Sequence, residues 1–589
     1  FCMVLDHALV SNMGGAALVS RDLSVDWLAL PRFDSPPLFL RVLDEVRGGY
    51  WSVRFGGEVV SVRRGYVGGA PILRSVVELR GGASIEVVDF MPIGISAFVR
   101  MVRAGPGVSY DMVIRPTFNY GLVEPYVEDH GRDALLINPL GNDAVELLLI
   151  EGSCEREGTE YRCSGPSTVM LHYPGDRRLS IIANRDFKSV VYNNFRSIYE
   201  ATLRFWRSVI GEGVNETSDR VEAVYRASIT VLLSLIYRTT GGIVSAPTTS
   251  LPEIIGEGRN WDYRFVWVRD ASLAATALLR AGYPQYARSI LAFLVGIADM
   301  LGKPFDYSVY TIDGTYPFDE REIPWLRGYM GSKPVRVGNA ATTQLQLDLE
   351  GWFMDALYEY VLRTEDRQFL ELAWPVIETA ADWCSSNYTL QDAGLWEQRD
   401  RYRHYVHSKA MMWVCLDRAS RLARIYGNRD LADEWGARAD KVREYVLSNQ
   451  PEMFTASFED RQVDAALLTL PLYGFVDVND KRFQKTLDQV VKELVVNNWV
   501  FRYRQDFLGT AKHPFVLTTE WLGMVYALMG KVDEARAILT NIANCANDLG
   551  LLGEHVDITA CEPRGNYPHI FSHSGYIILY NLIAEGKKT

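Results

Sequence analysis

The sequence lacks any run of about 18 apolar residues, which is the length that a membrane-spanning helix needs. Its start also lacks a basic segment followed by a long apolar stretch and a small-residue cleavage site, so we see no secretory signal. These absences argue against a membrane span and favour a cytoplasmic location. Because the sequence begins at Phe1 rather than Met, export remains an alternative.

An excess of positive charge is also missing. Lys and Arg number 61 against 73 Asp and Glu, which gives a formal charge of −12 and a pI near 5.4. Nucleic acids and anionic membranes are bound by basic surfaces, so we expect neither as a partner. With 48% hydrophobic and 12% aromatic residues, the composition is that of a folded globular protein. We expect no cofactor, and a homo-oligomer is compatible with this composition.

Cysteine is scarce, and its spacing does not indicate a metal site. The seven cysteines form no CxxC pair, and we do not interpret His555, His569 and His573 as metal ligands, so no metal is expected. Two pairs, Cys154/Cys163 and Cys545/Cys561, are close enough in sequence to form disulfides. Buried free thiols are the interpretation that we favour, with disulfides as the alternative.

The pattern of short apolar segments and turns in residues 1–195 predicts an antiparallel β-sandwich domain. Segments such as YWSVRF (50–55), ILRSVVELR (72–80) and AFVRMVRA (97–104) are short, rich in Val, and separated by Gly, Pro and Asp turns. From about Asn194 the pattern changes, and the following stretch has helical character. We therefore interpret residues 196–217 as a helical linker.

Residues 218–589 predict a helical domain. Apolar residues recur every three or four positions in twelve segments, namely 219–239, 270–281, 284–300, 341–363, 366–386, 405–425, 429–449, 462–471, 480–495, 517–529, 532–547 and 571–585. Short links alternate with longer connections, and the longest connections are 303–340, 387–404, 496–516 and 548–570. Twelve helices paired in this way describe an (α/α)6 barrel whose long loops share one face. Long loops are commonly functional, so we expect the site on that face.

Three of the long connections carry sequences with the same chemical character. They are RNWDYRFVWVRD (259–270), GLWEQRD (394–400) and LLGEHVD (551–557). A cavity lined by Trp, Tyr, Arg and carboxylates suits a sugar, because aromatic rings stack on the apolar faces of pyranoses and charged groups fix hydroxyls. We therefore expect a carbohydrate ligand.

Glu397 and Glu554 are the candidate catalytic pair. Two carboxylates roughly 6.5–9.5 Å apart can cleave a glycosidic bond with inversion, because one protonates the leaving oxygen while the other activates water. Trp396 would lower the polarity around Glu397, which favours a protonated acid. Taken singly, each Glu is explained equally well as a surface carboxylate, and the charges of 259–270 as a structural ion-pair network.

Five segments in this order resemble glycoside hydrolase family fifteen, and most closely its prokaryotic glucoamylase and trehalase branch. They are residues 17–39, 246–283, 331–357, 394–423 and 551–577. The resemblance implies a multidomain chain with an N-terminal antiparallel β-supersandwich, a helical linker and a C-terminal (α/α)6 catalytic barrel. It also implies an inverting, exo-acting hydrolase that releases β-glucose from α-glucosides.

The same resemblance assigns roles to individual positions. Glu397 would be the general acid and Glu554 the general base. The expected substrate-binding residues are Tyr263, Trp267, Arg269, Asp270, Trp396, Gln398 and Arg502. Among these, Arg269 and Asp270 would hold hydroxyls of the non-reducing glucose. Gln398 departs from the fungal members, which have a second acidic residue there, and it would contact the leaving sugar.

The expected substrate is an α-glucan or a maltooligosaccharide, since that activity spans more of the resembling family. Hydrolysis of α,α-trehalose is the alternative, because it also places an α-linked glucose in the first subsite. We expect the 303–340 loop to line the exit, and a pocket closed after two rings would favour trehalose. A sugar-binding protein without turnover is a remoter alternative, which the presence of both Glu397 and Glu554 argues against.

Overall fold

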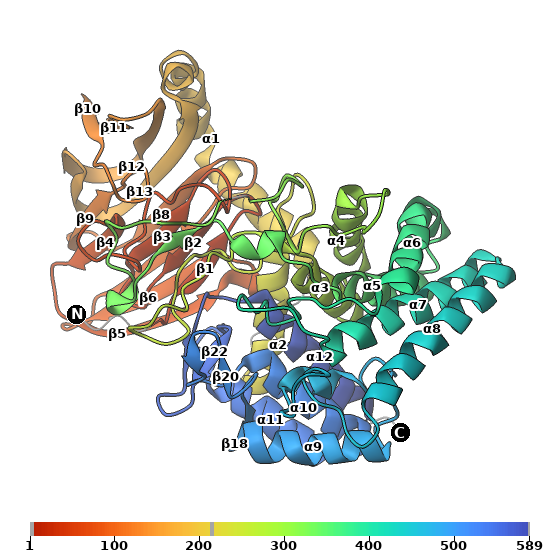
Figure 1. Ribbon diagram of the computed structural model, residues 1–589. Helices are drawn as coiled ribbons and strands as arrows, with labels where there is room; N and C mark the ends of the chain where they lie inside the picture. Colours follow the sequence, from red (N-terminus) through yellow and green to blue (C-terminus); the bar gives the residue numbers. More distant parts are fainter. Residues whose placement is uncertain (1–4, 213–216, 318, 587–589) are drawn as a thin grey trace. The chain divides into compact units, whose positions relative to one another are not determined.

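The computed structural model describes residues 5–212, 217–317 and 319–586 (Figure 1). The chain forms two compact units. The first comprises Phe1–Thr239, Glu322–Val335 and Asn547–Leu551, and the second comprises Thr240–Arg321, Arg336–Ala546 and Leu552–Thr589. Among the described residues, no helix combines the length and the apolar character that a membrane crossing requires.

The first unit is built on an antiparallel sheet, drawn in red to orange in Figure 1. Within the described residues its strands are β1 (Ala8–Ser11), β2 (Ala16–Val19), β3 (Val25–Ala29), β4 (Tyr50–Phe55), β5 (Val59–Tyr66), β6 (Leu73–Leu79), β7 (Ser84–Phe90), β8 (Ala97–Arg103), β9 (Ser109–Arg115), β10 (Tyr126–His130), β11 (Asp133–Ile137), β12 (Asp143–Glu157) and β13 (Glu160–Asp176). The main path runs β1-β2-β3-β4-β9-β13-β8-β7-β6-β5, and β12, β11 and β10 continue from β13. Alternating burial along β6 shows one face packed on a core that contains Trp51 and Phe98. The predicted β-sandwich is confirmed.

A long helix, α1 (Arg177–Ile210), follows the sheet and departs from helical geometry at Asn194, where φ is −129° and ψ is 19°. It begins at Arg177, well before the predicted linker of residues 196–217. Helix α2 (Arg220–Ser234) comes next and groups with the first unit, whereas the predicted barrel begins at residue 218. Residues 213–216 lie outside the described residues. The predicted domain boundaries at 195 and 217 remain a prediction.

The second unit is helical. Its helices are α3 (Val268–Arg280), α4 (Pro284–Ile297), α5 (Leu349–Thr364), α6 (Arg367–Asn387), α7 (Val406–Tyr426), α8 (Arg429–Asn449), α9 (Lys481–Leu494), α10 (Val516–Leu528), α11 (Val532–Asn544) and α12 (Ile570–Gly586), with the 3-10 helices η3 (Ala340–Thr343) and η4 (Ala465–Thr469). Short two- and three-residue strands lie in the loops: β14 (Val266–Trp267), β15 (Val309–Tyr310), β17 (Arg336–Val337), β18 (Val495–Val496), β19 (Trp499–Val500), β20 (Gln505–Asp506), β21 (Gly509–Thr510), β22 (His555–Asp557) and β23 (Glu562–Arg564).

The helices of the second unit form a closed inner ring. Contacts run from α3 to α5, α7, η4, α10 and α12, and from α12 back to α3. Residues Val516–Val525 of α10 are buried on every side, as expected for a helix inside a ring. Each inner element is preceded by a long connection, such as 388–405 before α7. All the long connections therefore meet the amino-terminal ends of the inner helices, which confirms the predicted barrel with its long loops on one face.

One predicted helix is wrong. The segment 462–471 was expected to be an α-helix, but only the 3-10 helix η4 forms there. Asp464 caps its start by accepting a hydrogen bond from the Ala466 amide at 2.8 Å. Pro471 has no N–H to donate and its ring clashes with the preceding turn, so the helix cannot continue past Leu470.

The expectation of free thiols is also wrong for four cysteines. Cys154 and Cys163 face each other on β12 and β13 with Cα atoms 4.1 Å apart, and they form a disulfide. A second disulfide joins Cys545 and Cys561. Sequence spacing could not reveal the first of these, because it depends on the register of two paired strands. Among the described cysteines, Cys384 and Cys415 are free and buried.

Two buried carboxyl groups support the loops around the inner helices. Asp392 accepts hydrogen bonds at Oδ2 from the Leu347 amide (2.9 Å) and from Ser408 (2.8 Å), whereas its Oδ1 is buried without a partner. Burial raises the pKa of Asp392 to about 7, and it raises the pKa of Asp464 to about 7 as well. Between about pH 4 and 7, both groups are therefore protonated in the folded protein but ionised in the unfolded chain.

This difference predicts a pH dependence of stability. The stabilisation from a raised carboxyl pKa is fully present below about pH 4 and is lost as the pH rises through about 7. Between pH 6.5 and 8, the free energy of unfolding should fall by about 1 kcal/mol for each of the two groups. Buried His407 and His569, whose pKa values burial lowers to about 4, act in the opposite direction but only below about pH 6.5. We expect the thermal midpoint, followed by circular dichroism, to fall between pH 6.5 and 8.

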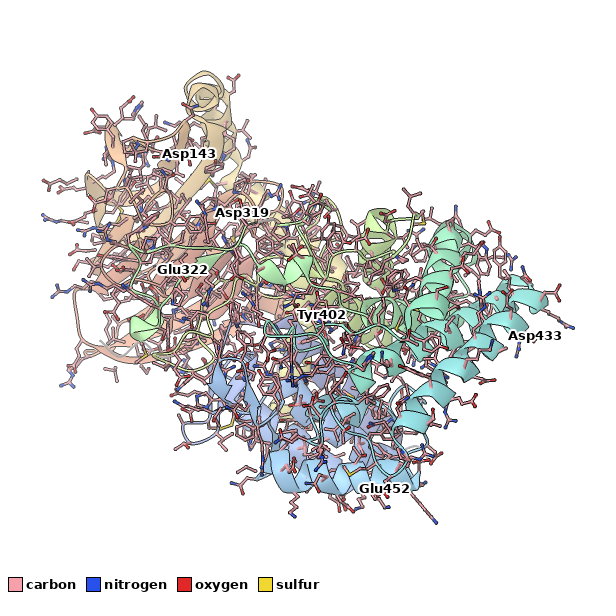
Figure 2. The ribbon with its side chains drawn as sticks, viewed as in Figure 1. Asp143, Asp319, Glu322, Tyr402, Asp433 and Glu452 are labelled. Atoms are coloured by element: carbon pink, nitrogen blue, oxygen red, sulfur yellow. A yellow bond between two sulfur atoms is a disulfide. The ribbon has the colours of Figure 1, made fainter. Side chains whose placement is uncertain are left out.

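Asp392→Asn mimics the protonated acid and should flatten this fall without unfolding the protein. The matched control is Asp433→Asn, since Asp433 lies exposed on α8 and is labelled in Figure 2. A midpoint that rises with pH over this interval, or an identical profile for Asp392→Asn and the unmodified protein, would contradict the assignment.

Candidate active site

Glu397 lies in the loop before α7, in a tight turn with a left-handed backbone (φ 56°). Its amide donates to the Gly394 carbonyl at 3.1 Å. Gly394 itself has φ 77°, and a Cβ there would stand 2.8 Å from the Tyr405 ring, so no other residue fits without strain. Left-handed backbone at a residue other than glycine is uncommon and is often found at functional sites.

Two donors hold the half-buried Glu397 carboxylate. The Trp267 indole N–H lies 3.3 Å from both Oε atoms, and the Gln346 amide donates to Oε2 at 2.8 Å. Both side chains come from other loops, those before α3 and α5. The turn is fastened further by Tyr402, whose hydroxyl accepts from the Leu345 amide at 2.9 Å (Tyr402 is labelled in Figure 2).

Gln346 is oriented by a buried ion pair. Arg269 donates to Asp348 from Nε (2.7 Å) and from Nη2 (3.0 Å), and Nη2 also donates to the Gln346 carbonyl oxygen at 2.7 Å. Burial opposes both charges, yet the ion pair holds the pKa of Asp348 below its usual range. A line of contacts therefore runs from Asp348 through Arg269 and Gln346 to Glu397. Our sequence analysis did not select Gln346, although it lies in a segment that carries the family resemblance.

Glu554 lies in the loop before α12 and is only 4% exposed. His555 Nε2 is 3.1 Å from its Oε1, and His569 Nε2 is 3.3 Å from its Oε2. The Tyr263 hydroxyl also bonds to this carboxylate, and burial together with the Glu554 charge raises the pKa of Tyr263 well above its usual value. The carboxylate is thus surrounded by hydrogen-bonding side chains from two loops.

Glu253 and Arg502 complete the charge balance beside Glu554. Arg502 donates to Glu253 Oε2 at 3.1 Å, and His555 Nε2 lies 3.4 Å from Glu253 Oε1. Burial alone would raise the pKa of Glu253, but the charges of Arg502 and His555 hold it well below its usual range. Burial would lower the pKa of His555, but the Glu253 charge and bonds to both carboxylates raise it. The two carboxylates thus favour the protonated form of His555.

The same group is the one cluster among the described residues with spacing suitable for a metal ion. Ligand atoms of Glu253, Glu554 and His555 all lie within 4.8 Å of one another. The His555 proton and the Arg502 guanidinium already compensate these carboxylates, so a cation would compete with both. His569, just before α12, and His573, within it, are four residues apart, a spacing that can bind metal, but His573 Nε2 accepts a hydrogen bond from the Leu552 amide at 3.0 Å.

Asp270 lies in the first turn of α3, where Ser245 donates to its Oδ2 at 2.8 Å. Burial raises the pKa of Asp270 to about 8, despite the adjacent Arg269 charge. At neutral pH it is therefore largely a neutral acid that can both donate to and accept from a sugar hydroxyl.

These side chains line two adjoining pockets of similar size in the second unit. We call the one that reaches Arg269 and Asp270 of the inner helix α3 the inner pocket and the other the outer pocket. The inner pocket has a volume of about 50 Å³, and its lining includes Ser245, Tyr263, Trp267, Arg269, Asp270, Trp396, Glu397, Arg502, Phe515, Glu554 and His569. The outer pocket has a volume of about 60 Å³ and is lined by Glu253, Arg259, Trp261, Tyr263, Asn339, Ala341, Trp396, Glu397, Arg399, Arg502, Tyr503, Asp506, Phe507 and Leu508. Four residues border both pockets: Tyr263, Trp396, Glu397 and Arg502. The guanidinium of Arg502 stands over the ring of Trp396, 5.6 Å from its centroid.

The structure brings together nearly all the residues selected from the sequence. Both candidate carboxylates and six of the seven substrate-binding candidates line the inner pocket; the exception is Gln398, which lines neither described pocket. Arg399, one position further, borders the outer pocket instead. Among the described residues of the 303–340 loop, only Asn339 reaches the outer pocket, and residues 322–335 group with the first unit. Asp262 and Arg264 pair with each other at 2.9 Å, which is the structural role considered for them.

Comparison with known proteins agrees with this architecture. Residues 219–581 match the family model for glycosyl hydrolases family 15, and residues 3–138 match a trehalase-like N-terminal model. Trehalase 2 of Sulfolobus acidocaldarius is 40% identical over 98% of both chains, and a trehalase of Mycobacterium tuberculosis is 29% identical over 98% of this chain and 89% of that protein. A bacterial glucoamylase solved with acarbose superposes with a TM-score of 0.73 at 14% identity, covering 99% of this chain and 94% of that chain, which shows a shared fold. The family model covers the helical part of the chain, and relatives match it over nearly its full length. The chain therefore belongs to glycosyl hydrolases family 15.

Proposed function

We propose that this hydrolase acts on α,α-trehalose, cleaving it with inversion at one anomeric carbon. The observation that carries the proposal is that relatives covering nearly the whole chain are named trehalases. The two pockets support it, because they meet at Glu397 and a disaccharide has one ring to place on either side of the bond that is cleaved. The sequence alone favoured α-glucans over trehalose, and the present proposal reverses that preference. The similarity to a glucoamylase shows a shared fold and does not favour α-glucans.

In the proposed mechanism one glucose ring occupies the inner pocket. Asp270 and Arg269 lie where they can bind its hydroxyls, while the glycosidic oxygen faces Glu397. Glu397 donates its proton to that oxygen as the bond to the anomeric carbon breaks. Trp267 and Gln346 hold the acid in place.

Glu554 acts on the opposite side as the general base. It removes a proton from a water molecule, whose oxygen attacks the anomeric carbon from the face opposite to the leaving sugar. His569, whose pKa burial lowers to about 4, is neutral and orients the carboxylate without neutralising it. The leaving glucose sits in the outer pocket among the polar groups of Glu253, Asn339 and Arg399.

Substrate preference gives the first test. We expect kcat/KM for trehalose to exceed that for maltose, maltotriose and soluble starch by at least tenfold, a difference of about 1.4 kcal/mol in transition-state binding. Glucose release is measured on all four substrates under identical conditions. Equal or faster hydrolysis of maltotriose or starch would overturn the proposal in favour of a glucoamylase-like activity.

Product configuration gives a test that needs no variants. Inversion at one carbon of trehalose yields one β-glucose from the attacked ring and one α-glucose from the leaving ring. Proton NMR before mutarotation should therefore show the two anomers in equal amounts. A retaining mechanism would release α-glucose from both rings, and an early signal from that anomer alone would rule out the inverting mechanism.

The two carboxylates are tested by amide substitution. Glu397→Gln and Glu554→Gln keep the side-chain size but remove the acid and the base, so kcat for trehalose should fall by roughly 10²–10⁴-fold or more in each. The control is Asp400→Asn, since Asp400 is an exposed carboxylate in the same loop as Glu397. Near-normal turnover by either Gln variant would refute the role of that residue.

A further inference from the structure

A small hairpin borders the outer pocket in the loop before α10. Strands β20 and β21 pair Gln505 with Thr510 and Asp506 with Gly509, which leaves Phe507 and Leu508 at the tip. Both tip residues line the outer pocket, and both remain partly exposed, at 38% and 42%. The tip therefore borders both the outer pocket and solvent.

A buried ion pair pins this hairpin. Arg259, which comes from the loop before α3, donates to both carboxylate oxygens of Asp506, and its Nη2 also donates to the Gly509 carbonyl at 3.1 Å. The side chains of Arg259 and Asp506 are only 4% and 5% exposed. Tyr503 adds a hydrogen bond to Asp506 at 2.8 Å. The hairpin is therefore fixed at its base rather than free to swing.

Asp506 also sets the shape of the tip. The Leu508 amide donates to Asp506 Oδ1 at 2.8 Å, so the carboxylate that binds Arg259 also closes the two-residue turn. The Asp506 carboxylate thus fixes both the position of the hairpin and the conformation of its apolar tip. Bidentate pairing of a carboxylate with arginine is well suited to this, because both groups are planar and directional.

We propose that the 505–510 hairpin, held in place by the ion pair between Arg259 and Asp506, ends the substrate pocket after the second sugar ring. The inference rests on the proposed hydrolysis of a disaccharide and names the element that limits its length. With the first ring in the inner pocket and the second in the outer pocket, a third α-linked ring would have to pass through the space taken by Phe507 and Leu508. A two-ring substrate instead places its second ring against that apolar tip.

The test compares two competitors that differ by one ring. Maltose and maltotriose are measured as inhibitors of trehalose hydrolysis, and the readout is the ratio of their inhibition constants. In the unmodified protein, maltotriose should bind at least tenfold more weakly than maltose. The double substitution Phe507→Gly and Leu508→Gly should reduce this difference to less than threefold, because it removes the obstructing side chains.

Val496→Gly is the matched control. Val496 is an apolar residue with 47% exposure in the neighbouring β18–β19 hairpin, and it lines neither described pocket. Its inhibition ratio should equal that of the unmodified protein. Asp506→Asn provides a second variant that keeps the side-chain volume but weakens the pin, and it should shift the ratio in the same direction as the double glycine variant.

The outcomes separate this inference from the proposed function. If trehalose is the preferred substrate and the ratio stays unchanged in both hairpin variants, the hairpin does not limit substrate length. If the unmodified protein binds maltotriose as tightly as maltose, the pocket is not closed after two rings and the inference is likewise overturned. Preference for maltotriose over trehalose in direct hydrolysis would instead reject the proposed function. Should the double glycine variant lose all activity, the Asp506→Asn ratio decides.

Discussion

The buried ion pair of Arg269 and Asp348 is the interaction on which the acid side of the site depends. Arg269 offers only donors, so Gln346 must turn its carbonyl oxygen towards the guanidinium and its amide nitrogen towards Glu397. Loss of one partner of such a pair leaves an uncompensated buried charge, which costs about 3–5 kcal/mol. The position of Glu397 is thus linked to the packing of the inner helices, because Arg269 lies in the first turn of α3 and Asp348 directly precedes α5.

The base side is organised by a different principle. Around Glu397 the direct donors are neutral, an indole and an amide, whereas Glu554 is adjoined by a charged group of Glu253, Arg502 and His555. The His555 proton and the Arg502 charge balance two buried carboxylates, so the base is stabilised without a direct ion pair of its own to arginine. The two catalytic candidates therefore stand in environments that differ in charge, which is the requirement when one carboxyl group is to give a proton and another to take one.

Much of the fold could be predicted because helical periodicity and loop length are local properties. The alternation of short and long connections placed the site on one face, and nearly every selected residue borders the inner pocket. The failures concern non-local or competing effects. Strand register decided the Cys154–Cys163 disulfide, and Pro471 overrode the helical pattern of 462–471. Glu253 and His569 acquire their roles only through loops that the fold brings together, so no spacing in the sequence could reveal them.

Gln398 illustrates why adjacency to a candidate catalytic residue is weak evidence that a side chain contacts the substrate. The turn at Gly394 directs Glu397 into the pocket, while the carbonyl of Gln398 accepts from Gln344 at 3.3 Å and its side chain borders neither described pocket. The outer pocket, where the proposed mechanism places the leaving sugar, is lined by residues from three other loops, including Arg259 and Asp506. A barrel that also occurs in a glucoamylase at 14% identity cannot determine the substrate by its helices. We therefore expect substrate choice to reside in the loops at the amino-terminal ends of those helices, and loops from four connections meet at the outer pocket.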